Sequence, residues 1–307
     1  FRLSASRRRC GHFARRDSPF PSPSPRAARP SALGMGAMWS VAAHHGVSLA
    51  SSVSSVRLAH IPLLVVSGST GLIGTCYVLA ATAGHARVLL PMISDCFRRA
   101  PESYLAGWGM AGFACVGLLL SVLAMGGYLQ RFQAVSAAEV RLRVCSAWLG
   151  LLACAGFGEA SLVTERDDNF MHCAGALVGF FAYYLYAIVL TAALYRCREA
   201  GAASRTSLGC KAACISLGML AVLAFCCLVA NGALDRKVGG EDGDRAVAFC
   251  EWVSVLSMAL FNLTFRLEFG NDLRLSDVWP ATAKNIWAWS AKDACAEPLL
   301  AAEPAQA

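Results

Sequence analysis

The sequence has few charged residues. Charged side chains make up 15% of its 307 residues, whereas they make up about 25% of a typical soluble domain. Hydrophobic residues account for 56% of the chain, and the mean hydropathy is +0.50. A water-soluble domain would need more polar surface than this composition supplies. The shortage of charge therefore indicates a membrane protein.

Motifs for several common kinds of site are also missing. The chain has 14 cysteines but no Cys-x-x-Cys pair, and no group of Cys and His residues has zinc-binding spacing. It has no nucleotide-binding motif and no recognisable nucleophile paired with a base. Many cysteines lie inside apolar runs, where they serve as small packing residues. The sequence therefore predicts no metal, no cofactor and no catalytic residue.

Long apolar runs, in contrast, are abundant. A membrane-spanning helix needs about 20 mostly apolar residues, and six stretches qualify: residues 61–83, 105–128, 144–163, 173–195, 212–234 and 247–265. Alternating strands with a period of two are absent, which argues against a membrane β-barrel. We predict an all-α polytopic membrane protein, a six-transmembrane-helix bundle with short loops.

The two ends of the chain differ from this membrane domain of residues 61–265. Residues 1–34 contain eight arginines and one acidic residue, and residues 18–26 are rich in Pro and Ser. Such a composition cannot build a core, so we expect a disordered tail over residues 1–60, with residues 1–34 not native. The alternative is a basic arm for anionic lipid or nucleic acid. Residues 266–307 are expected to form a cytosolic tail.

The loops indicate an orientation. Short loops rich in Lys and Arg stay in the cytosol. The loops after the second and fourth predicted spans have a basic excess that includes Lys211, whereas the other loops mix basic and acidic residues. We therefore expect both termini in the cytosol.

Four polar residues lie near the ends of predicted spans. Glu102 begins the second span, Glu159 lies near the end of the third, His172 precedes the fourth and Glu251 lies near the start of the sixth. Because successive spans alternate in direction, we expect these four residues at the same, non-cytosolic face, as a candidate structural or functional cluster. Structural roles are also open to them, since Pro101 and Glu102 suit the first turn of the second span and His172 suits a cap of the fourth span.

Two stripes indicate which helix faces meet other helices. His172, Gly175 and Gly179 share one stripe, and Gly175 and Gly179 form a Gly-x-x-x-Gly pattern that permits close helix approach. A polar stripe of the sixth span consists of Glu251, Ser254, Met258 and Asn262. Carboxylates within spans usually face a bundle interior or a water-filled cavity. We expect this for Glu251, with solvation at the interface as the alternative, and leave both open for Glu159.

Three short motifs, taken in order, resemble one protein family. They are Pro91-x-Ile93-Ser94 followed by Pro101-Glu102-Ser103, then His172-x-x-Gly175-Ala176, then Cys250-Glu251-Trp252. They resemble the first lumenal loop, the fourth span and the sixth span of the damage-regulated autophagy modulator (DRAM) family. That family is grouped with the transmembrane protein 150 proteins in the Frag/DRAM/Sfk group of six-span membrane proteins. The resemblance covers about residues 61–272, and the branch within the family stays open.

The resemblance implies a multispan protein that modulates autophagy and cell survival at lysosomal, endosomal or plasma membranes. We interpret the chain as a non-enzymatic membrane regulator. The alternative is a lipid- or ion-handling protein, either a channel subunit or a factor related to phosphoinositides or GPI lipids. An enzyme that uses His172 with two carboxylates is a third possibility.

The expected partners are membrane lipids and proteins that bind the C-terminal tail. Trp279, Trp287 and Trp289 of this tail are expected to lie at the membrane interface. No nucleic-acid partner is expected.

Overall fold

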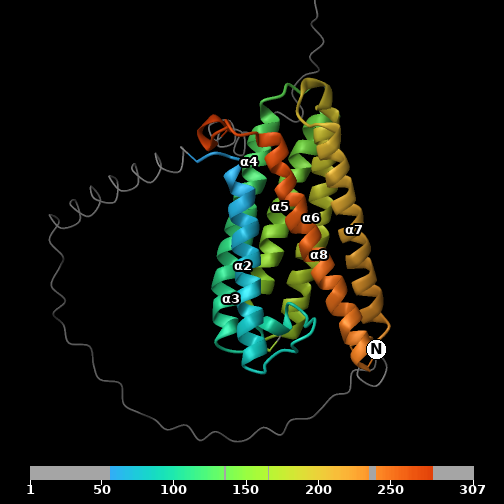
Figure 1. Ribbon diagram of the computed structural model, residues 1–307. Helices are drawn as coiled ribbons and strands as arrows, with labels where there is room; N and C mark the ends of the chain where they lie inside the picture. The colour runs from blue at the N-terminus through green and yellow to red at the C-terminus, as the bar shows by residue number, and fades with distance from the viewer. Residues whose placement is uncertain (1–55, 135, 165, 235–239, 279–307) are drawn as a thin grey trace, which may run out of the picture. The chain divides into compact units, whose positions relative to one another are not determined.

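The computed structural model describes residues 56–134, 136–164, 166–234 and 240–278. Within these ranges the chain is helical and has no β-strand. Six of its helices are long and apolar enough to cross a membrane, and they stand side by side in Figure 1. The predicted fold class, an all-α bundle of six membrane helices, is confirmed. Residues 1–55 of the predicted N-terminal tail and the tryptophan segment of residues 279–289 lie outside the described residues, whereas His60, predicted as the last residue of that tail, begins the first helix.

The elements follow one another in a simple order. They are α2 (His60–Thr82), a 3-10 turn (Asp95–Phe97), α3 (Glu102–Met110), a π-helical segment (Ala111–Gly117), α4 (Leu118–Gln130), α5 (Ala137–Leu162), α6 (Asn169–Arg196), a second 3-10 turn (Arg198–Ala200), α7 (Arg205–Ala230) and α8 (Gly240–Phe269). The segment α3–α4 is continuous and makes one span, Glu102–Gln130.

Several helices extend beyond the predicted apolar windows. The third span begins at Ala137 rather than at residue 144, because Ser136 caps it by accepting a hydrogen bond from the backbone N–H of Glu139. The sixth span continues to Phe269 rather than ending at residue 265, so the predicted tail begins inside α8. Apolar windows find the part of a helix inside the lipid, while capping residues set where the helix ends.

Small residues set the closest helix crossing, between α5 and α6. A Cβ atom on Gly156 would lie 2.5 Å from the backbone nitrogen of Gly179, and one on Gly175 would lie 2.9 Å from the backbone nitrogen of Ala160. Neither helix could come this close if these positions carried a side chain. The Gly-x-x-x-Gly pattern of α6 therefore packs against α5, as its spacing predicts.

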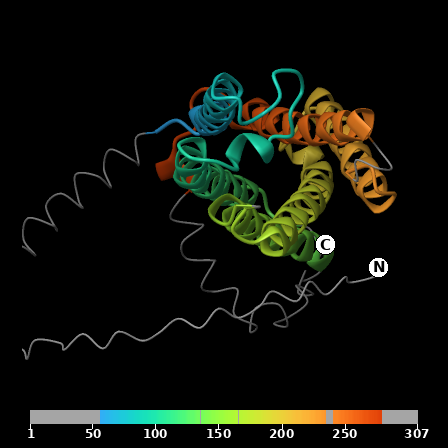
Figure 2. The ribbon, with the colours of Figure 1, turned by 90° about the horizontal axis from the view of Figure 1, so that it is seen from below.

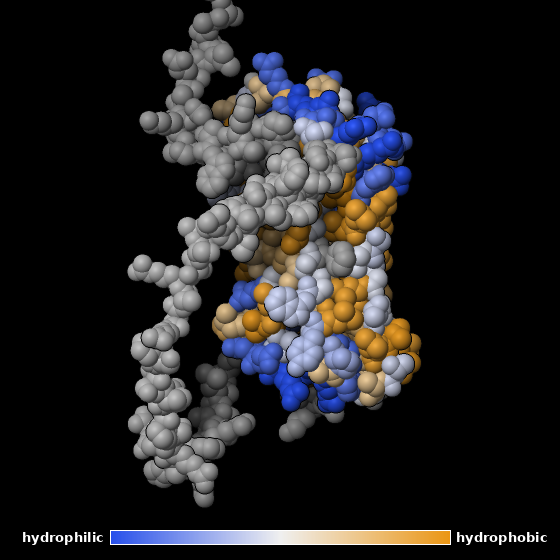
Figure 3. Space-filling model, turned by 90° about the vertical axis from the view of Figure 1, so that its left-hand side faces the viewer, coloured by the Kyte–Doolittle hydropathy of each residue, from blue (hydrophilic) through white to orange (hydrophobic). Residues whose placement is uncertain are grey.

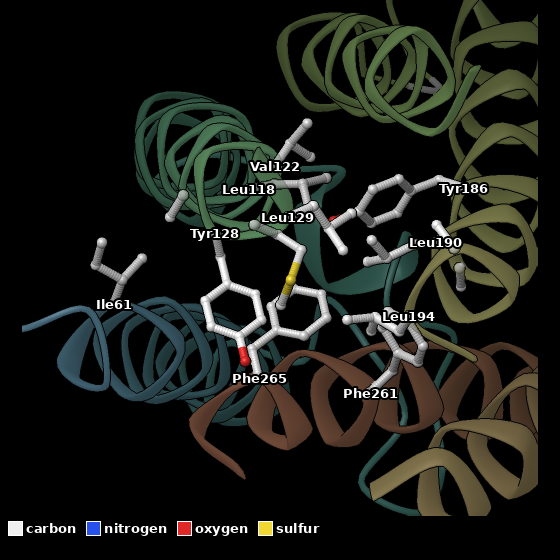
Figure 4. Packing of buried hydrophobic residues seen from close by; sticks show 14 of the residues in the cluster. Ile61, Leu118, Val122, Tyr128, Leu129, Tyr186, Leu190, Leu194, Phe261 and Phe265 are labelled. Atoms are coloured by element: carbon white, nitrogen blue, oxygen red, sulfur yellow. The ribbon is translucent and has the colours of Figure 1, made fainter. Parts of the chain in front are cut away.

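The other helices complete a closed bundle, seen end-on in Figure 2. Helix α7 packs on α6 and α8, while α2 packs on α3, α4 and α8. The core lies where α4, α6 and α8 meet, and it is rich in aromatic residues (Figure 4). Tyr183, Phe261 and Phe265 form a chain of edge-to-face ring contacts with centroids 6.0 and 5.3 Å apart. Such contacts favour one defined packing over a loose apolar one.

The outer surface is apolar across its middle. Figure 3 shows hydrophobic side chains over the central part of one face and hydrophilic ones towards both ends. Large apolar residues such as Trp148, Leu220 and Leu256 are more than half exposed. In water such exposure would favour aggregation, whereas in a bilayer these side chains contact lipid tails.

The segments that flank the six helices meet at one end of the bundle. Just before α2 and just after α8, the backbone N–H of Leu58 donates to the carbonyl of Leu273, at 2.8 Å. The N–H of Leu275 donates to the carbonyl of Val56, at 2.9 Å. We call this end of the bundle the terminal end. The opposite end, which carries the α2–α3 loop of residues 83–101, is called the loop end.

Candidate functional site

The loop end contains the four polar residues that the sequence places on one face. Glu102 is the first residue of α3, Glu159 lies in the last turn of α5, His172 lies in the first turn of α6, and Glu251 lies on the part of α8 near this end. The structure therefore brings them to the same end of the bundle. It does not bring all four to one site, because their side chains have different partners.

Glu251 and Trp252 bind the α2–α3 loop to helix α8. The Glu251 carboxylate (Oε2) accepts a hydrogen bond from the backbone N–H of Ile93, at 2.7 Å. The indole Nε1 of Trp252 donates to the carbonyl of Pro91, at 2.8 Å. We call these two contacts the loop clamp. They join two of the sequence motifs, which are far apart in the chain, into one structural unit.

Glu102 is held by a residue that the sequence motifs do not include. Its carboxylate (Oε1) lies 2.7 Å from Nδ1 of His85 in the α2–α3 loop, and the Glu102 side chain is 1% exposed. The second carboxylate oxygen, Oε2, has no hydrogen-bond partner among the described residues. Glu102 begins a helix, as Pro101-Glu102-Ser103 predicts, and it also anchors the loop. A lone histidine between apolar runs carries no pattern that would identify this partner.

His172 closes the end of the neighbouring helix α5. Its Nδ1 lies 2.9 Å from the carbonyls of both Ala160 and Val163. Because carbonyl oxygens only accept, Nδ1 carries the proton. His172 therefore caps the C-terminal end of α5 and not the fourth span, as the sequence suggested, because Asp168 caps α6 by accepting from the N–H groups of Phe170 and Met171. Glu159 is half-buried beside Gly175, and its carboxylate makes no hydrogen bond or ion pair with a described residue.

A mostly apolar cavity of about 170 Å³ lies beneath the loop clamp. His172 and Glu251 line it, whereas Glu102 and Glu159 do not. Ile93 and Ser94 of the α2–α3 loop cover its outer end, and Asn262 of α8 marks its deeper end. The polar stripe predicted on α8 therefore faces this cavity through Glu251, Met258 and Asn262.

The remaining motif residues have structural positions. Gly175 is buried at the α5–α6 crossing, Cys250 is buried on α8 with its carbonyl bound by Ser254, and Pro101 and Ser103 flank the first residue of α3. The loop, the fourth span and the sixth span, which carry the three motifs, meet at the loop end of the bundle. The contacts made there explain why the three motifs occur together in one sequence.

Cys96 lies in the α2–α3 loop among acidic groups. Burial, and then the charges of Asp95 and Glu251, raise the pKa of its thiol to about 12. A thiol with so high a pKa stays protonated near neutral pH and is a poor nucleophile. In the described part of the chain, moreover, no group of three His, Cys, Asp or Glu residues is placed to hold a metal ion.

A second polar cluster, which sequence reasoning missed, lies at the terminal end. Lys211 of α7 and Glu268 of α8 form an ion pair at 2.8 Å, and both side chains are fully buried. The ammonium group of Lys211 also donates to Ser207 and Thr264, at 3.0 and 2.6 Å. The sequence pattern places Lys211 among the loop residues that set the orientation. It lies instead inside the α7–α8 interface, where its charge is neutralised.

Comparison with known proteins identifies the family. Residues 57–271 match the family described as the Frag1/DRAM/Sfk1/Cwh43P N-terminal domain. The chain is 25% identical over 224 residues to human DNA damage-regulated autophagy modulator protein 1, an alignment that covers 71% of this chain and 94% of the human protein.

The protein of the same name from Mus musculus is 24% identical over 224 residues, covering 71% of this chain and 94% of that protein. The one from Xenopus laevis is 24% identical over 226 residues, covering 70% of this chain and 91% of that protein. No solved structure matches the chain. The family match covers well over half of the chain and includes all six helices, so the protein is a multi-pass integral membrane protein of the Frag1/DRAM/Sfk1/Cwh43P family.

Proposed function

We propose that the protein is a non-enzymatic membrane regulator that modulates autophagy and cell survival. The observation that carries this proposal is the similarity to DNA damage-regulated autophagy modulator protein 1, which extends over 94% of the human relative. The match follows the whole membrane domain rather than one isolated motif. A function that this protein shares with its human relative would therefore belong to the whole six-helix domain.

The contacts at the loop end support a non-enzymatic role. The Glu251 carboxylate, which lines the cavity, is engaged with the backbone, since its Oε2 accepts a hydrogen bond from the Ile93 N–H. A catalytic base has to be within hydrogen-bond reach of a substrate proton. Here that oxygen holds a loop.

The test is autophagic flux in cells that lack the protein or overproduce it. We expect flux to change in opposite directions in the two cases, and the wild-type chain to restore it in the knockout. The matched comparison uses Glu251→Ala, which breaks the loop clamp, and Asp277→Asn at an exposed position of the terminal end. Unchanged flux in both knockout and overproducing cells would refute the proposal.

The membrane in which it acts is part of the proposal. We place the protein in lysosomal or endosomal membranes or in the plasma membrane, with membrane lipids and proteins bound to its C-terminal tail as partners. Imaging of the tagged protein, with markers for each membrane, distinguishes these locations. A signal confined to mitochondria or the nuclear envelope would contradict all of them.

A lipid- or ion-handling role is the second candidate, favoured by the cavity that Glu251 and His172 line. Purified protein in liposomes tests it directly. Ion flux or lipid transfer that falls when the loop clamp is broken by Glu251→Ala would support this role. Liposomes that show neither activity would exclude it.

A further inference from the structure

We propose that a groove between α6 and α7, at the terminal end of the bundle, binds one anionic phospholipid of the surrounding membrane. We call this site the α6–α7 groove. The inference goes beyond the regulatory role proposed above, because it assigns a binding site and the class of lipid that the site takes. It does not rest on that role, since it concerns binding by the purified protein.

The α6–α7 groove is a surface hollow of about 640 Å³ between the last two turns of α6 and the first two turns of α7. Tyr195, Arg196, Gly209 and Ala212 line it, and all four are exposed. A Cβ atom added to Gly209 would meet no neighbouring atom within 4 Å. The volume is within the range of about 300–1,000 Å³ that is usual for small-molecule sites. A ligand can therefore reach the groove without displacing a buried side chain.

The groove lies on a surface that faces lipid. Helix α7 stands at the edge of the bundle in Figure 2, and only 17% of its apolar window is buried. Further along α7, Leu217 and Leu220 are more than half exposed, as expected for contact with lipid tails. Ala192, Leu208 and Ala212 give the groove apolar walls next to the polar connection between the two helices. These walls suit the part of an acyl chain that is nearest to the headgroup.

Three arginines gather around this hollow. Arg196 lines the groove itself. The guanidinium carbon of Arg198 lies 5.2 Å from the centroid of the Tyr195 ring, which also lines the groove. Arg205 begins α7 one turn before Gly209, on the same face of the helix. Both helices therefore bring positive charge to the groove.

These charges are not neutralised within the described part of the chain. The three arginines form no ion pair with a described residue, and a guanidinium group stays charged at physiological pH. Residues 196–205 contain one acidic residue, Glu199, so the segment has a net charge of +2. Lys211 and Glu268 neutralise each other and leave this charge unchanged. The groove is thus a positively charged site at the edge of an apolar surface.

This combination selects a lipid whose headgroup has a net negative charge. Phosphate and carboxylate oxygens accept paired hydrogen bonds from guanidinium groups, and basic segments next to a membrane span attract anionic lipids. A phosphatidylcholine headgroup has no net charge to offset the arginines. A soluble anion or an acidic peptide would meet the arginines but not the apolar walls. An anionic phospholipid matches both.

The experiment is photolabelling of the purified full chain in phosphatidylcholine nanodiscs. The probe is phosphatidylserine with a diazirine near the glycerol end of one acyl chain. Mass spectrometry should find labelled residues within 191–196 of α6 and 208–212 of α7. Excess phosphatidylserine should reduce this labelling by about fivefold or more, because the headgroup charge supplies the affinity. Excess phosphatidylcholine, which lacks the charge, and inorganic phosphate, which lacks the chain, should each reduce it by less than about twofold.

Variants test the charge and the space of the groove separately. The double variant Arg196→Gln with Arg205→Gln should reduce labelling by about fivefold or more, whereas Arg141→Gln, at an exposed position of α5 near the same end, should leave it unchanged. Gly209→Phe should fill the groove and also abolish labelling. Its control is Gly71→Phe on α2, which is exposed and equally free of neighbours. Thermal unfolding shows which variants are folded, and the arginine variants test the proposal even if Gly209→Phe does not fold.

Three results would overturn the proposal. The first is equal labelling of the groove by a phosphatidylcholine probe, because the arginines would then select nothing. The second is competition by inorganic phosphate or by an acidic peptide as strong as that by phosphatidylserine, because the occupant would then not be a lipid. The third is labelling that persists unchanged in a folded double arginine variant or in a folded Gly209→Phe variant.

Discussion

At the scale of single residues, Glu251 holds the α2–α3 loop through its charge. A carboxylate that accepts a backbone N–H makes a hydrogen bond stronger than one between neutral groups. Because Ile93 also covers the cavity, this contact connects the stability of the loop with the shape of the space beneath it. Substitutions at Glu251 should therefore destabilise the α2–α3 loop more than they destabilise the rest of the bundle.

We expect Glu251→Ala to lower the free energy of unfolding by about 1–3 kcal/mol, since the Ile93 N–H loses its partner. Glu251→Gln keeps an acceptor without the charge and should cost less. Hydrogen–deuterium exchange at the Ile93 amide, together with thermal unfolding in detergent, measures both effects. The control Asp277→Asn should change stability by less than about 0.5 kcal/mol. Equal effects of Glu251→Ala and Asp277→Asn would contradict the clamp.

Cys96 gives a pH-dependent test of the same loop. Its pKa is raised to about 12, so the reactive thiolate should increase about tenfold with each pH unit between pH 8 and 10, without a plateau. We expect alkylation by iodoacetamide to follow this slope. Cys173, which is exposed on α6 near the same end, should react first. Half-maximal reaction of Cys96 below pH 9 would show that the loop does not bury this thiol.

The buried pair of Lys211 and Glu268 predicts a large asymmetry between single and double substitutions. Lys211→Met should cost about 3–5 kcal/mol, because it leaves the Glu268 carboxylate buried without a counter-charge. The double variant Lys211→Met with Glu268→Leu should recover most of that loss. Thermal unfolding in detergent measures both. A double variant as unstable as the single one would mean that the ion pair itself is the source of stability.

At the scale of helices, the α5–α6 crossing depends on the absence of side chains. Gly156→Ala should destabilise the bundle by about 1–3 kcal/mol, since its Cβ would meet the backbone of α6 at 2.5 Å. Gly74→Ala on α2 is the matched control. Nothing lies within 4 Å of the added atom there, so the helix should gain about 0.5–1 kcal/mol. Thermal unfolding and size-exclusion chromatography of both variants measure these effects. A Gly156→Ala variant as stable as the wild type would contradict the close packing of α5 on α6.

The helices themselves can be predicted from sequence, because runs of about 20 apolar residues are typical of membrane spans and rare elsewhere. Their contacts are harder to predict. The pattern of α8 indicates that Glu251 faces inward, but its partner Ile93 lies in a loop before α3, and no local rule connects the two. The prediction for Lys211 is wrong for a related reason. A lysine at the edge of an apolar run resembles a loop residue until Glu268 is seen beside it.

At the scale of the whole molecule, the two flanks of the membrane domain lie on the same side. This follows from an even number of spans and from the hydrogen bonds of Leu58 and Leu275 across the terminal end. We expect protein tags at residue 56 and residue 278 to be equally accessible to protease in intact vesicles, and both to face the cytosol. One protected and one exposed tag would contradict six spans. Two protected tags would contradict only the orientation taken from basic loops.

The Lys211–Glu268 pair also constrains how the protein is made. Helix α7 emerges from the ribosome before α8, so Lys211 enters the membrane region before its counter-charge exists. An unpaired lysine in a span is costly in lipid. The last two helices are therefore expected to leave the insertion machinery together as a hairpin. In a nascent chain that stops short of Glu268, α7 would remain bound to that machinery or to a chaperone.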